Sequence, residues 1–593
     1  MYCINNILTK KNINLIVRIV YAFSIVYFLP NIFKCFDGLD FSYSVISIAL
    51  FVVILMSIFS YGMQFYNIKL ANKIIYLAVS FTFLLCMVLG KMLDTKGYLQ
   101  IDIKSIFAPI IVAPYMAMFI NSVYSYIYKH GSKIVSGDSE KNSLSKNELI
   151  ISFVYLMICW GIVLFGVFPG FFVYDAGDEL LEVITRQFNT HHPLLHVLYM
   201  GGTVQAGYKI FGSYNAGIFC FTLMQMLFFA LGVIYAEWKM CAFGFGKKLC
   251  RTMIIVMGLF PVFPMFVLCS SKDSIFSLVL LLWVVKAYEN IRFPKKHVDV
   301  MWIVWSVLMC LLRNNALYAM MPTCFIMFVV WKEHRKRVLQ LFVATIGITI
   351  IFSSGMKIVL NAKESGHQEI LTVPIQQLAR IYTLEGDTFS AEEKEKLFSY
   401  LPEKYINRYV PKISDGVKIG FDNDAYDKDS AGFWKLWIKG LKSSPVSYLN
   451  AWLLTSYGYW YPDTIVDVYK GNTVYTFTYG DNTYFGYETE QPGNRKSYIP
   501  VIDSFYNKLS LDIYKEKVPV LSMLFSQGFV LWVMILAITY ILIYGGVRKI
   551  MPYLILVMMV LTLLLGPTFL PRYVFFVWLC ISFIVGDMFT VHK

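Results

Sequence analysis

The chain has 593 residues, of which 57% are hydrophobic and only 15% are charged, and its mean hydropathy is +0.58. A water-soluble protein cannot bury that much apolar surface, so the composition excludes a soluble domain and indicates many membrane-spanning helices. The net charge of +14 does not indicate nucleic-acid binding, because lysine and arginine gather in short loops between apolar segments, as membrane topology requires.

Fourteen apolar segments lie along the chain, and most are close to the roughly 20 residues that a helix needs to cross a bilayer. We expect transmembrane helices at about 13–33, 43–61, 73–92, 106–128, 149–169, 214–238, 252–269, 273–290, 299–312, 315–331, 338–358, 519–545, 550–566 and 572–590. An even number of crossings places both chain ends on one side. Lysines and arginines are denser in the loops on that side, which the positive-inside rule assigns to the cytoplasm.

The first four segments fall within residues 1–128 and precede a stretch at 129–148 that is rich in Ser, Lys, Gly and Asn. That composition is typical of a flexible linker, which the predicted topology places in the cytoplasm. A second block of apolar segments, residues 149–358, follows. We expect this block to be the core of the protein, with 170–213 as its first external loop.

The segment FPGFFVYDAGDE (168–179) places three carboxylates, Asp175, Asp178 and Glu179, at the outer mouth of the fifth predicted helix. Ionisable side chains at a membrane boundary are costly unless they face a cavity or a partner, so they are candidates for a functional site. The alternative is that they only solvate a loop, as most charge clusters do. The neighbours favour function, because the same predicted face also receives three histidines: His191, His192 and His196.

The segment HHPLLHVLYMGGTVQAGYKIFG (191–212) resembles a further crossing. A crossing here would move the basic loop at 239–251 outside the membrane and invert every later loop. Gly201, Gln205 and Lys209 also suit the membrane interface better than hydrocarbon. We therefore expect a helix that lies on the outer interface.

Three cations at distant outer turns are candidates for binding a phosphate group. Lys272 precedes Asp273 in the segment CSSKDSIF, at a predicted outer turn. The alternative is that this is an ordinary polar turn in which Ser271 caps the next helix. Arg313 in LLRNNALY is flanked by two amides, which suits a phosphate; the alternative is a snorkelling arginine beside a tight turn. Arg572 in GPTFLPRY has the same two interpretations.

Together these charges permit one kind of chemistry at the depth of lipid headgroups. A carboxylate can take a proton from an attacking hydroxyl group. Cations can hold and neutralise a phosphate or diphosphate leaving group. Transfer of a sugar from a lipid-phosphate carrier to an acceptor outside the membrane needs both.

Residues 359–518 form the one large polar region, which we expect to be an extracytoplasmic domain of mixed α/β structure. The segment 390–409 predicts a helix with Ser390 as its N-cap, and 433–462 predicts two helices that meet at Ser444 and Pro445. In VYTFTYGDNTYFGYE (474–488), apolar and polar residues alternate about a Gly-Asp-Asn turn, which predicts a β-hairpin. Residues 519–593 add three closing transmembrane helices.

Seven motifs in order give the block from about residue 149 onward a resemblance to the GT-C superfamily of integral-membrane glycosyltransferases, and to a bacterial family within it. The motifs are FPGFFVYDAGDE, THHPLLH, SSKDSIF, LLRNNALY, VPIQQLAR (373–380), YGYWYP (457–462) and PRYVF (571–575). The resemblance covers roughly three-quarters of the chain and omits the first four helices. It implies an all-α polytopic fold with a GT-C-like core and a polyprenyl-phosphate-linked or polyprenyl-diphosphate-linked sugar as donor.

The resemblance also implies roles for individual residues. An acid of the first external loop is the general base of the superfamily, and the matching residue here is Asp175, with Asp178 and Glu179 as rivals. Lys272, Arg313 and Arg572 are implied to hold the donor phosphate. We expect five side chains to line the substrate and acceptor pocket: Asp178, Glu179, His191, His192 and Asp273.

The function predicted from the sequence is therefore a glycosyltransferase of the bacterial plasma membrane that glycosylates a cell-envelope glycan or glycolipid. Its partners would be the lipid-linked donor, the acceptor and the bilayer, with no nucleic acid. We expect no cofactor, although Asp175 with Asp178 could bind a divalent metal as in some superfamily members. The alternatives are a glycan polymerase or ligase with a polyprenyl-diphosphate substrate, a transporter, and a non-catalytic receptor.

Overall fold

The computed structural model describes residues 10–39, 44–135, 144–295, 297–468, 475–476, 487–512, 518 and 520–591. Within these ranges, ten helices are long and apolar enough to cross a membrane. They are α2 (Lys10–Ile32), α3 (Val45–Tyr66), α4 (Leu70–Lys96), α5 (Ile103–Val135), α6 (Lys146–Gly166), α9 (Tyr214–Ala242), α12 (Lys272–Arg292), α15 (Arg335–Val359), α26 (Gln527–Gly545), and α29 (Phe575–Met588) together with the 3-10 turn η6 (Pro571–Val574) before it. The chain is thus an all-helical, multi-pass membrane protein, as its composition predicts.

The other four predicted crossings are also helical, but they are short or broken. They correspond to α10 (Lys247–Leu259) with α11 (Val262–Val267), to α13 (Val300–Leu312), to α14 (Asn315–Val330), and to α28 (Leu554–Leu563) after the 3-10 turn η5 (Met551–Tyr553). The prediction of fourteen full crossings therefore becomes ten long helices and four shorter apolar segments. The break between α10 and α11 contains Pro261, which cannot donate a helical hydrogen bond.

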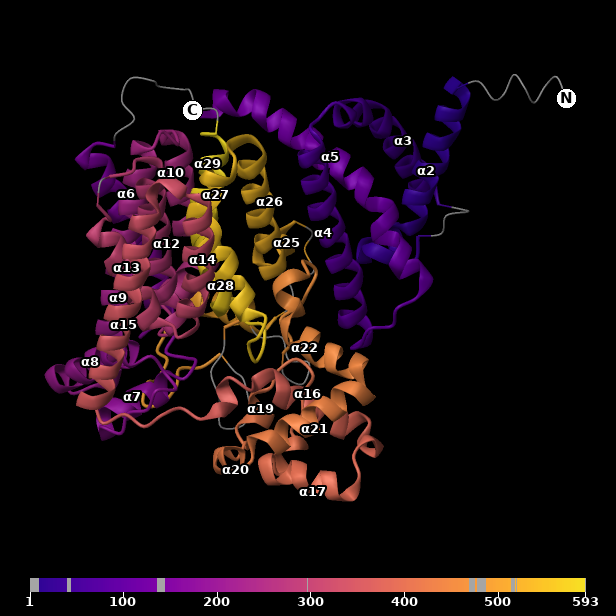
Figure 1. The fold of residues 1–593 in the computed structure, drawn as a ribbon. Coiled ribbons are helices and arrows are strands. Elements are labelled where there is room, and N and C mark those ends of the chain that lie inside the picture. Colours follow the sequence, from indigo (N-terminus) through magenta and orange to yellow (C-terminus); the bar gives the residue numbers. More distant parts are fainter. Residues whose placement is uncertain are drawn as a thin grey trace, which may run out of the picture.

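Two helices near the segment 168–179, which we call the acidic loop, do not cross the bundle. Figure 1 shows α7 (Ala176–Thr185) and α8 (Leu194–Phe211) side by side at the end of the bundle opposite the start of α2 and the end of α29. We call this the cavity end, and the opposite one the terminal end. The expectation that 191–212 lies at the interface agrees with this arrangement.

The four N-terminal helices pack beside the rest of the bundle, with α4 against α22 (Pro445–Trp460) and α26. The Tyr457 hydroxyl donates to Asp94 Oδ1 at 2.9 Å, and the Tyr124 hydroxyl donates to the Leu536 carbonyl at 2.6 Å. The predicted linker 129–148 is shorter in the structure, because α5 continues to Val135 and α6 begins at Lys146.

The polar region is helical rather than mixed α/β. Its further helices are α16 (Thr372–Leu384), α17 (Ala391–Tyr400), α18 (Glu403–Ile406), α19 (Asp415–Lys418), α20 (Asn423–Lys428), α21 (Ser430–Ser443) and α23 (Pro500–Leu511). Within the described ranges of the chain no strand forms, and only isolated bridges are found. Most of the predicted hairpin at 474–488 lies outside the described residues. The region has its own apolar core, to which Ile375, Leu397 and Phe433 belong.

The predicted N-cap in this region is confirmed, because Ser390 caps α17 in a capping box with Glu393. The single helix predicted over 390–409 is wrong, because the chain breaks at Leu401 and Pro402 into α17 and α18. The helix pair α21 and α22 meets at Ser444 and Pro445. Figure 1 shows α16, α17, α19, α20 and α21 of this region at the cavity end of the bundle, where they lie over the site described below.

Candidate functional site

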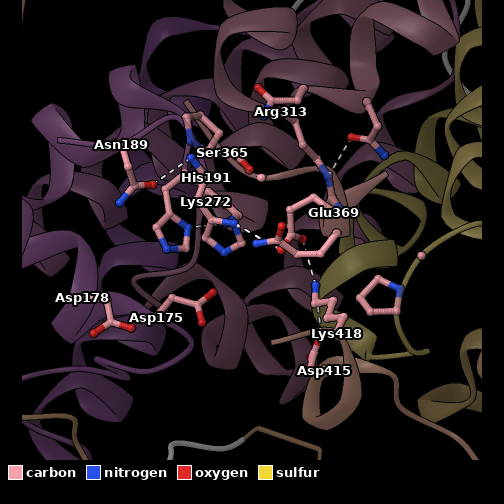
Figure 2. A pocket seen from close by; sticks show the side chains of 18 of the residues that line it. Asp175, Asp178, Asn189, His191, Lys272, Arg313, Ser365, Glu369, Asp415 and Lys418 are labelled. Carbon is pink, nitrogen blue, oxygen red and sulfur yellow. Dashed lines mark hydrogen bonds and ion pairs between the residues drawn. The ribbon is translucent and has the colours of Figure 1, made fainter. Parts of the chain in front are cut away.

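A cavity of about 900 Å³ opens at the cavity end, between the bundle and the polar region. We call it the main cavity. It is lined by seven of the nine predicted site residues: Asp175, Asp178, His191, His192, Lys272, Arg313 and Arg572. Figure 2 shows Asp175 and Asp178 on one side of it and Asp415 and Lys418 on the other. Glu179 and Asp273 do not line it but lie buried behind its wall.

The acidic loop is fixed against the turn that begins α12. The Phe171 N–H donates to the Leu268 carbonyl at 3.0 Å, and the Ser270 N–H donates to the Phe171 carbonyl at 2.9 Å. The buried Ser270 hydroxyl also accepts from the Val173 N–H. These bonds hold Asp175 close to the start of α12, where Ser271 caps the helix as predicted.

Asp273 binds two arginines that are far apart in the sequence. It is 1% exposed and forms a direct ion pair with Arg313 Nη1. Its Oδ2 lies 3.6 Å from Arg572 Nε, and Arg572 Nη1 lies 3.7 Å from Asp175 Oδ2. Arg572 is therefore held between two carboxylates. Because Asp273 neutralises part of this positive charge from behind, Asp273 positions the cations rather than lining the cavity.

Arg572 retains unused hydrogen-bonding capacity. Its Nε and Nη1 atoms are buried without a hydrogen-bond partner, and only Nη2 donates, to the Tyr573 hydroxyl at 2.9 Å. Its guanidinium group lies 4.3 Å from the ring centre of Tyr174 and 4.7 Å from that of Tyr573. Nε and Nη1 face the carboxylates of Asp273 and Asp175 at 3.6 and 3.7 Å, beyond hydrogen-bond distance, so this arginine keeps charge-assisted donor capacity.

Lys272 and Arg313 complete what we call the inner wall, the three cations Lys272, Arg313 and Arg572. Arg313 Nε donates to Asn315 Oδ1 at 3.0 Å, so one of the two predicted amides orients it. Lys272 Nζ lies 2.8 Å from His192 Nδ1. Burial and the charge of Lys272 lower the pKa of His192 to about 3, so His192 is neutral at physiological pH and accepts this bond.

Asp175 is ionised in this setting. Burial raises the pKa of its carboxyl group, but the charges of Arg572 and Lys272 outweigh that effect and hold the pKa below its ordinary value. Glu179 differs, because its carboxylate is 2.6 Å from His196 Nδ1 and is 2% exposed. Glu179 therefore orients histidines behind the cavity and is no rival to Asp175 at the surface of the cavity.

The polar region contributes an outer wall that sequence reasoning missed: Glu369, Asp415 and Lys418. Lys418 Nζ pairs with Glu369 Oε2 at 2.8 Å and with Asp415 Oδ1 at 3.0 Å, and Glu369 Oε1 lies 3.5 Å from His191 Nδ1. Burial lowers the pKa of Lys418, but Asp415 and Glu369 raise it by more, so it stays charged. These residues stand in ordinary charged sequence, and no local pattern distinguishes them.

An apolar groove of about 610 Å³ lies between α8, α9, α12 and α13. Its lining begins next to the inner wall, because Leu312 precedes Arg313 and Ile275 follows Lys272 by one helical turn. It continues along α12 to Lys286, roughly 16 Å further at 1.5 Å per residue. The groove therefore lies at the depth of lipid tails, beside charges that lie at the depth of headgroups.

No metal centre is evident in the described ranges, where no group of three or more His, Cys, Asp or Glu side chains is arranged to hold an ion. The pair that the sequence offered for a divalent metal is Asp175 and Asp178. The Asp175 carboxylate already faces Arg572, which a bound cation would have to displace.

The fold and the site define a multi-pass, all-helical membrane protein with a charged cavity at one end of its bundle. Residues 184–592 match the model of the "Family of unknown function (DUF6020)", and the chain belongs to that family. The match begins after the acidic loop and leaves out the four N-terminal helices. No curated protein and no solved structure matches the chain.

Proposed function

We propose that the chain is a membrane glycosyltransferase that moves a sugar from a polyprenyl-phosphate-linked donor to a hydroxyl group of a cell-envelope glycan or glycolipid. One observation carries the proposal. The Asp175 carboxylate and the three cations of the inner wall line one cavity, and an apolar groove begins beside them. The ordered motifs that resemble the GT-C superfamily support the same assignment.

The inner wall suits the phosphate of such a donor. The guanidinium group of Arg572, whose Nη1 makes no hydrogen bond in the structure, would donate to phosphate oxygens, and charge-assisted bonds of this kind are strong. Lys272 and Arg313 would add further positive charge. The lipid chain would lie in the groove, so that the charged head and the apolar tail of one molecule each find a matching surface.

In this proposal Asp175 acts as the general base. The acceptor hydroxyl attacks the anomeric carbon, and a new C–O bond forms while the bond from that carbon to the phosphate oxygen breaks. Polyprenyl phosphate leaves with the bonding electrons, and the Asp175 carboxylate accepts the hydroxyl proton. The cations stabilise the charge that develops on the leaving phosphate.

We assign the cavity end to the outside of a bacterial plasma membrane and the terminal end to the cytoplasm. At the terminal end, α10 begins with Lys247 and Lys248, and α15 begins with Arg335 and Lys336. This basic content supports the orientation through the positive-inside rule.

The test is transfer from a panel of polyprenyl-phosphate sugars by the full chain in proteoliposomes. We expect Asp175→Asn to lower kcat by about 10²- to 10⁴-fold, because the proton acceptor is lost. Arg313→Ala should lower kcat/KM for the donor by about 10²-fold, because the leaving phosphate loses a stabilising charge. Asp387→Asn, an exposed site away from the cavity, is the matched control and should retain activity.

Full activity of both Asp175→Asn and Arg313→Ala would overturn this mechanism. If Asp175→Asn keeps full activity and His192→Ala loses it, the alternative is supported: a polymerase or ligase that uses a polyprenyl-diphosphate substrate. His192 discriminates well because it contacts Lys272 directly.

A further inference from the structure

A second cavity, which we call the side cavity, has a volume of about 620 Å³ and shares Asp175, Asp178 and Leu181 with the main cavity. The rest of its described lining comes from α7, from Tyr214 and from residues 490–492 of the polar region. The two cavities therefore adjoin at the acidic loop. The proposed base is accessible from both.

The segment that closes the side cavity is attached to the acidic loop. The Gly177 N–H donates to Glu490 Oε2 at 2.8 Å. The Glu490 N–H donates to the Phe172 carbonyl, also at 2.8 Å. Because these bonds join the two segments on either side of the opening, the side cavity is a defined part of the fold.

The two cavities differ in charge. The main cavity contains the three cations of the inner wall, whereas the described lining of the side cavity includes three carboxylates, Asp175, Asp178 and Glu490, and no Lys, Arg or His. An anion placed among these carboxylates is repelled, and Arg572, which pairs with Asp175, is not among the described lining residues of the side cavity. Carboxylates do accept hydrogen bonds from uncharged hydroxyl groups.

The side cavity also has an apolar flank. Ile184 and Leu181 are 41% and 54% exposed and line it together with Tyr214, whose ring is stacked on that of Tyr208. An aromatic ring and aliphatic side chains suit the C–H faces of a sugar or an attached alkyl chain. Hydrogen-bond acceptors at one end and apolar side chains at the other fit an uncharged carbohydrate.

We propose that the side cavity binds the acceptor, and that the acceptor presents there an uncharged carbohydrate hydroxyl without a phosphate group. This inference rests on the proposed function and narrows its acceptor. The acceptor hydroxyl enters from the side cavity and gives its proton to Asp175, while the donor phosphate is held by the inner wall. The two substrates then reach the reacting carbon from different cavities and do not compete for the cations.

The test is photo-crosslinking to the full chain in nanodiscs, with mapping of the labelled peptides by mass spectrometry. One probe is an uncharged alkyl glycoside that carries a diazirine, and the other is the same glycoside with a 6-phosphate. We expect the uncharged probe to label 177–184, 214 or 490–492, and the phosphate probe to label 191–193 or 313–315 around the inner wall. Equal labelling of one cavity by both probes would overturn the inference.

A charge variant tests the same site. Ile184→Lys should lower labelling by the uncharged probe about tenfold, a loss of roughly 1.4 kcal/mol in binding, and should bring the phosphate probe into the side cavity. Ile210→Lys on α8, 73% exposed and not among the lining residues of either cavity, is the control and should leave both patterns unchanged. If Ile184→Lys behaves like the control, the side cavity is not the acceptor site.

The outcomes separate this inference from the proposed function. If the uncharged probe labels the side cavity but the protein transfers no sugar, the proposed glycosyltransferase function is refuted and the carbohydrate-binding site is supported. If sugar transfer depends on Asp175 but neither probe labels the side cavity, the proposed function is supported and the acceptor site in the side cavity is refuted.

Discussion

Four carboxyl groups lie within two helical turns of one another, and their surroundings give them different tasks. Asp175 faces Arg572 and both cavities, whereas Glu179 is buried against His196. Asp178 is exposed between the cavities. Glu182 accepts from the Asn189 side-chain amide at 2.7 Å, and burial raises its pKa to about 7. Only Asp175 combines an ionised carboxylate with a cationic wall.

The pKa of Glu182 predicts a pH-dependent stability. Since an unfolded glutamate titrates near 4.5, the folded protein holds more protons than the unfolded chain between that value and about 7. Its stability therefore falls as pH rises through this window. Relative to Glu182→Gln, which has no such proton, the thermal midpoint of the wild type should fall by roughly 1–3 °C between pH 5 and 8.

The measurement is a fluorescence melting series of both proteins across that pH range. Glu395→Gln, at an exposed position of α17, is the control and should follow the wild type at every pH. Parallel pH profiles for wild type and Glu182→Gln would show that the Glu182 pKa does not change on folding.

At this scale the sequence predicted the inner half of the site but not the outer half. Acids and cations beside apolar segments are rare, so Asp175, Lys272 and Arg313 stand out. Lys418 and Glu369 lie in a polar region where charges are common, and only tertiary folding brings them to the cavity. Asp273 was expected in the pocket, but pairing with two arginines keeps it behind the wall.

At the scale of elements, the acidic loop depends on a glycine where it joins α6. Gly170 has φ of +134°, and a Cβ atom there would lie 2.5 Å from the Thr222 hydroxyl. We expect Gly170→Ala to destabilise the protein by about 1–3 kcal/mol and to reduce activity, because the loop that carries Asp175 must move. Thermal unfolding and transfer assays on the same preparations measure both effects.

Gly161→Ala on α6 is the matched control, since a Cβ atom at that position meets nothing within 4 Å. It should be neutral or slightly stabilising, because alanine favours helix. If both variants behave alike, the positive φ of Gly170 is not required for the acidic loop.

Hydropathy predicted every membrane element, because length and apolarity are local properties of the chain. The hydropathy-based prediction was wrong at breaks such as the one between α10 and α11, where Pro261 interrupts a helix within a continuously apolar segment. The mixed α/β prediction is not supported, because the described residues of the polar region form helices and the alternating segment behind the prediction lies mostly outside them.

At the scale of the whole molecule, the two ends of the bundle differ. The described chain ends share the terminal end, and the polar region covers the cavity end. The hydrogen bond from Tyr457 to Asp94 joins the N-terminal helices to α22.

Impermeant thiol labelling tests the orientation that we propose. A cysteine in Asp387→Cys should react with a maleimide reagent in intact cells, whereas one in Lys336→Cys should react only after permeabilisation; both positions are exposed. The wild type corrects for its native cysteines. Labelling of Lys336→Cys in intact cells would reverse the orientation.

The shortness of α13 and α14 has a consequence for the surrounding bilayer. At 1.5 Å per residue, their 13 and 16 residues reach only about 20 and 24 Å, against a hydrocarbon core of roughly 30 Å. Such a hydrophobic mismatch is relieved by local thinning of the bilayer. We therefore expect lipid headgroups beside this hairpin to sink toward Arg313, so that the phosphate of the proposed lipid-linked donor meets the inner wall without being lifted out of its leaflet.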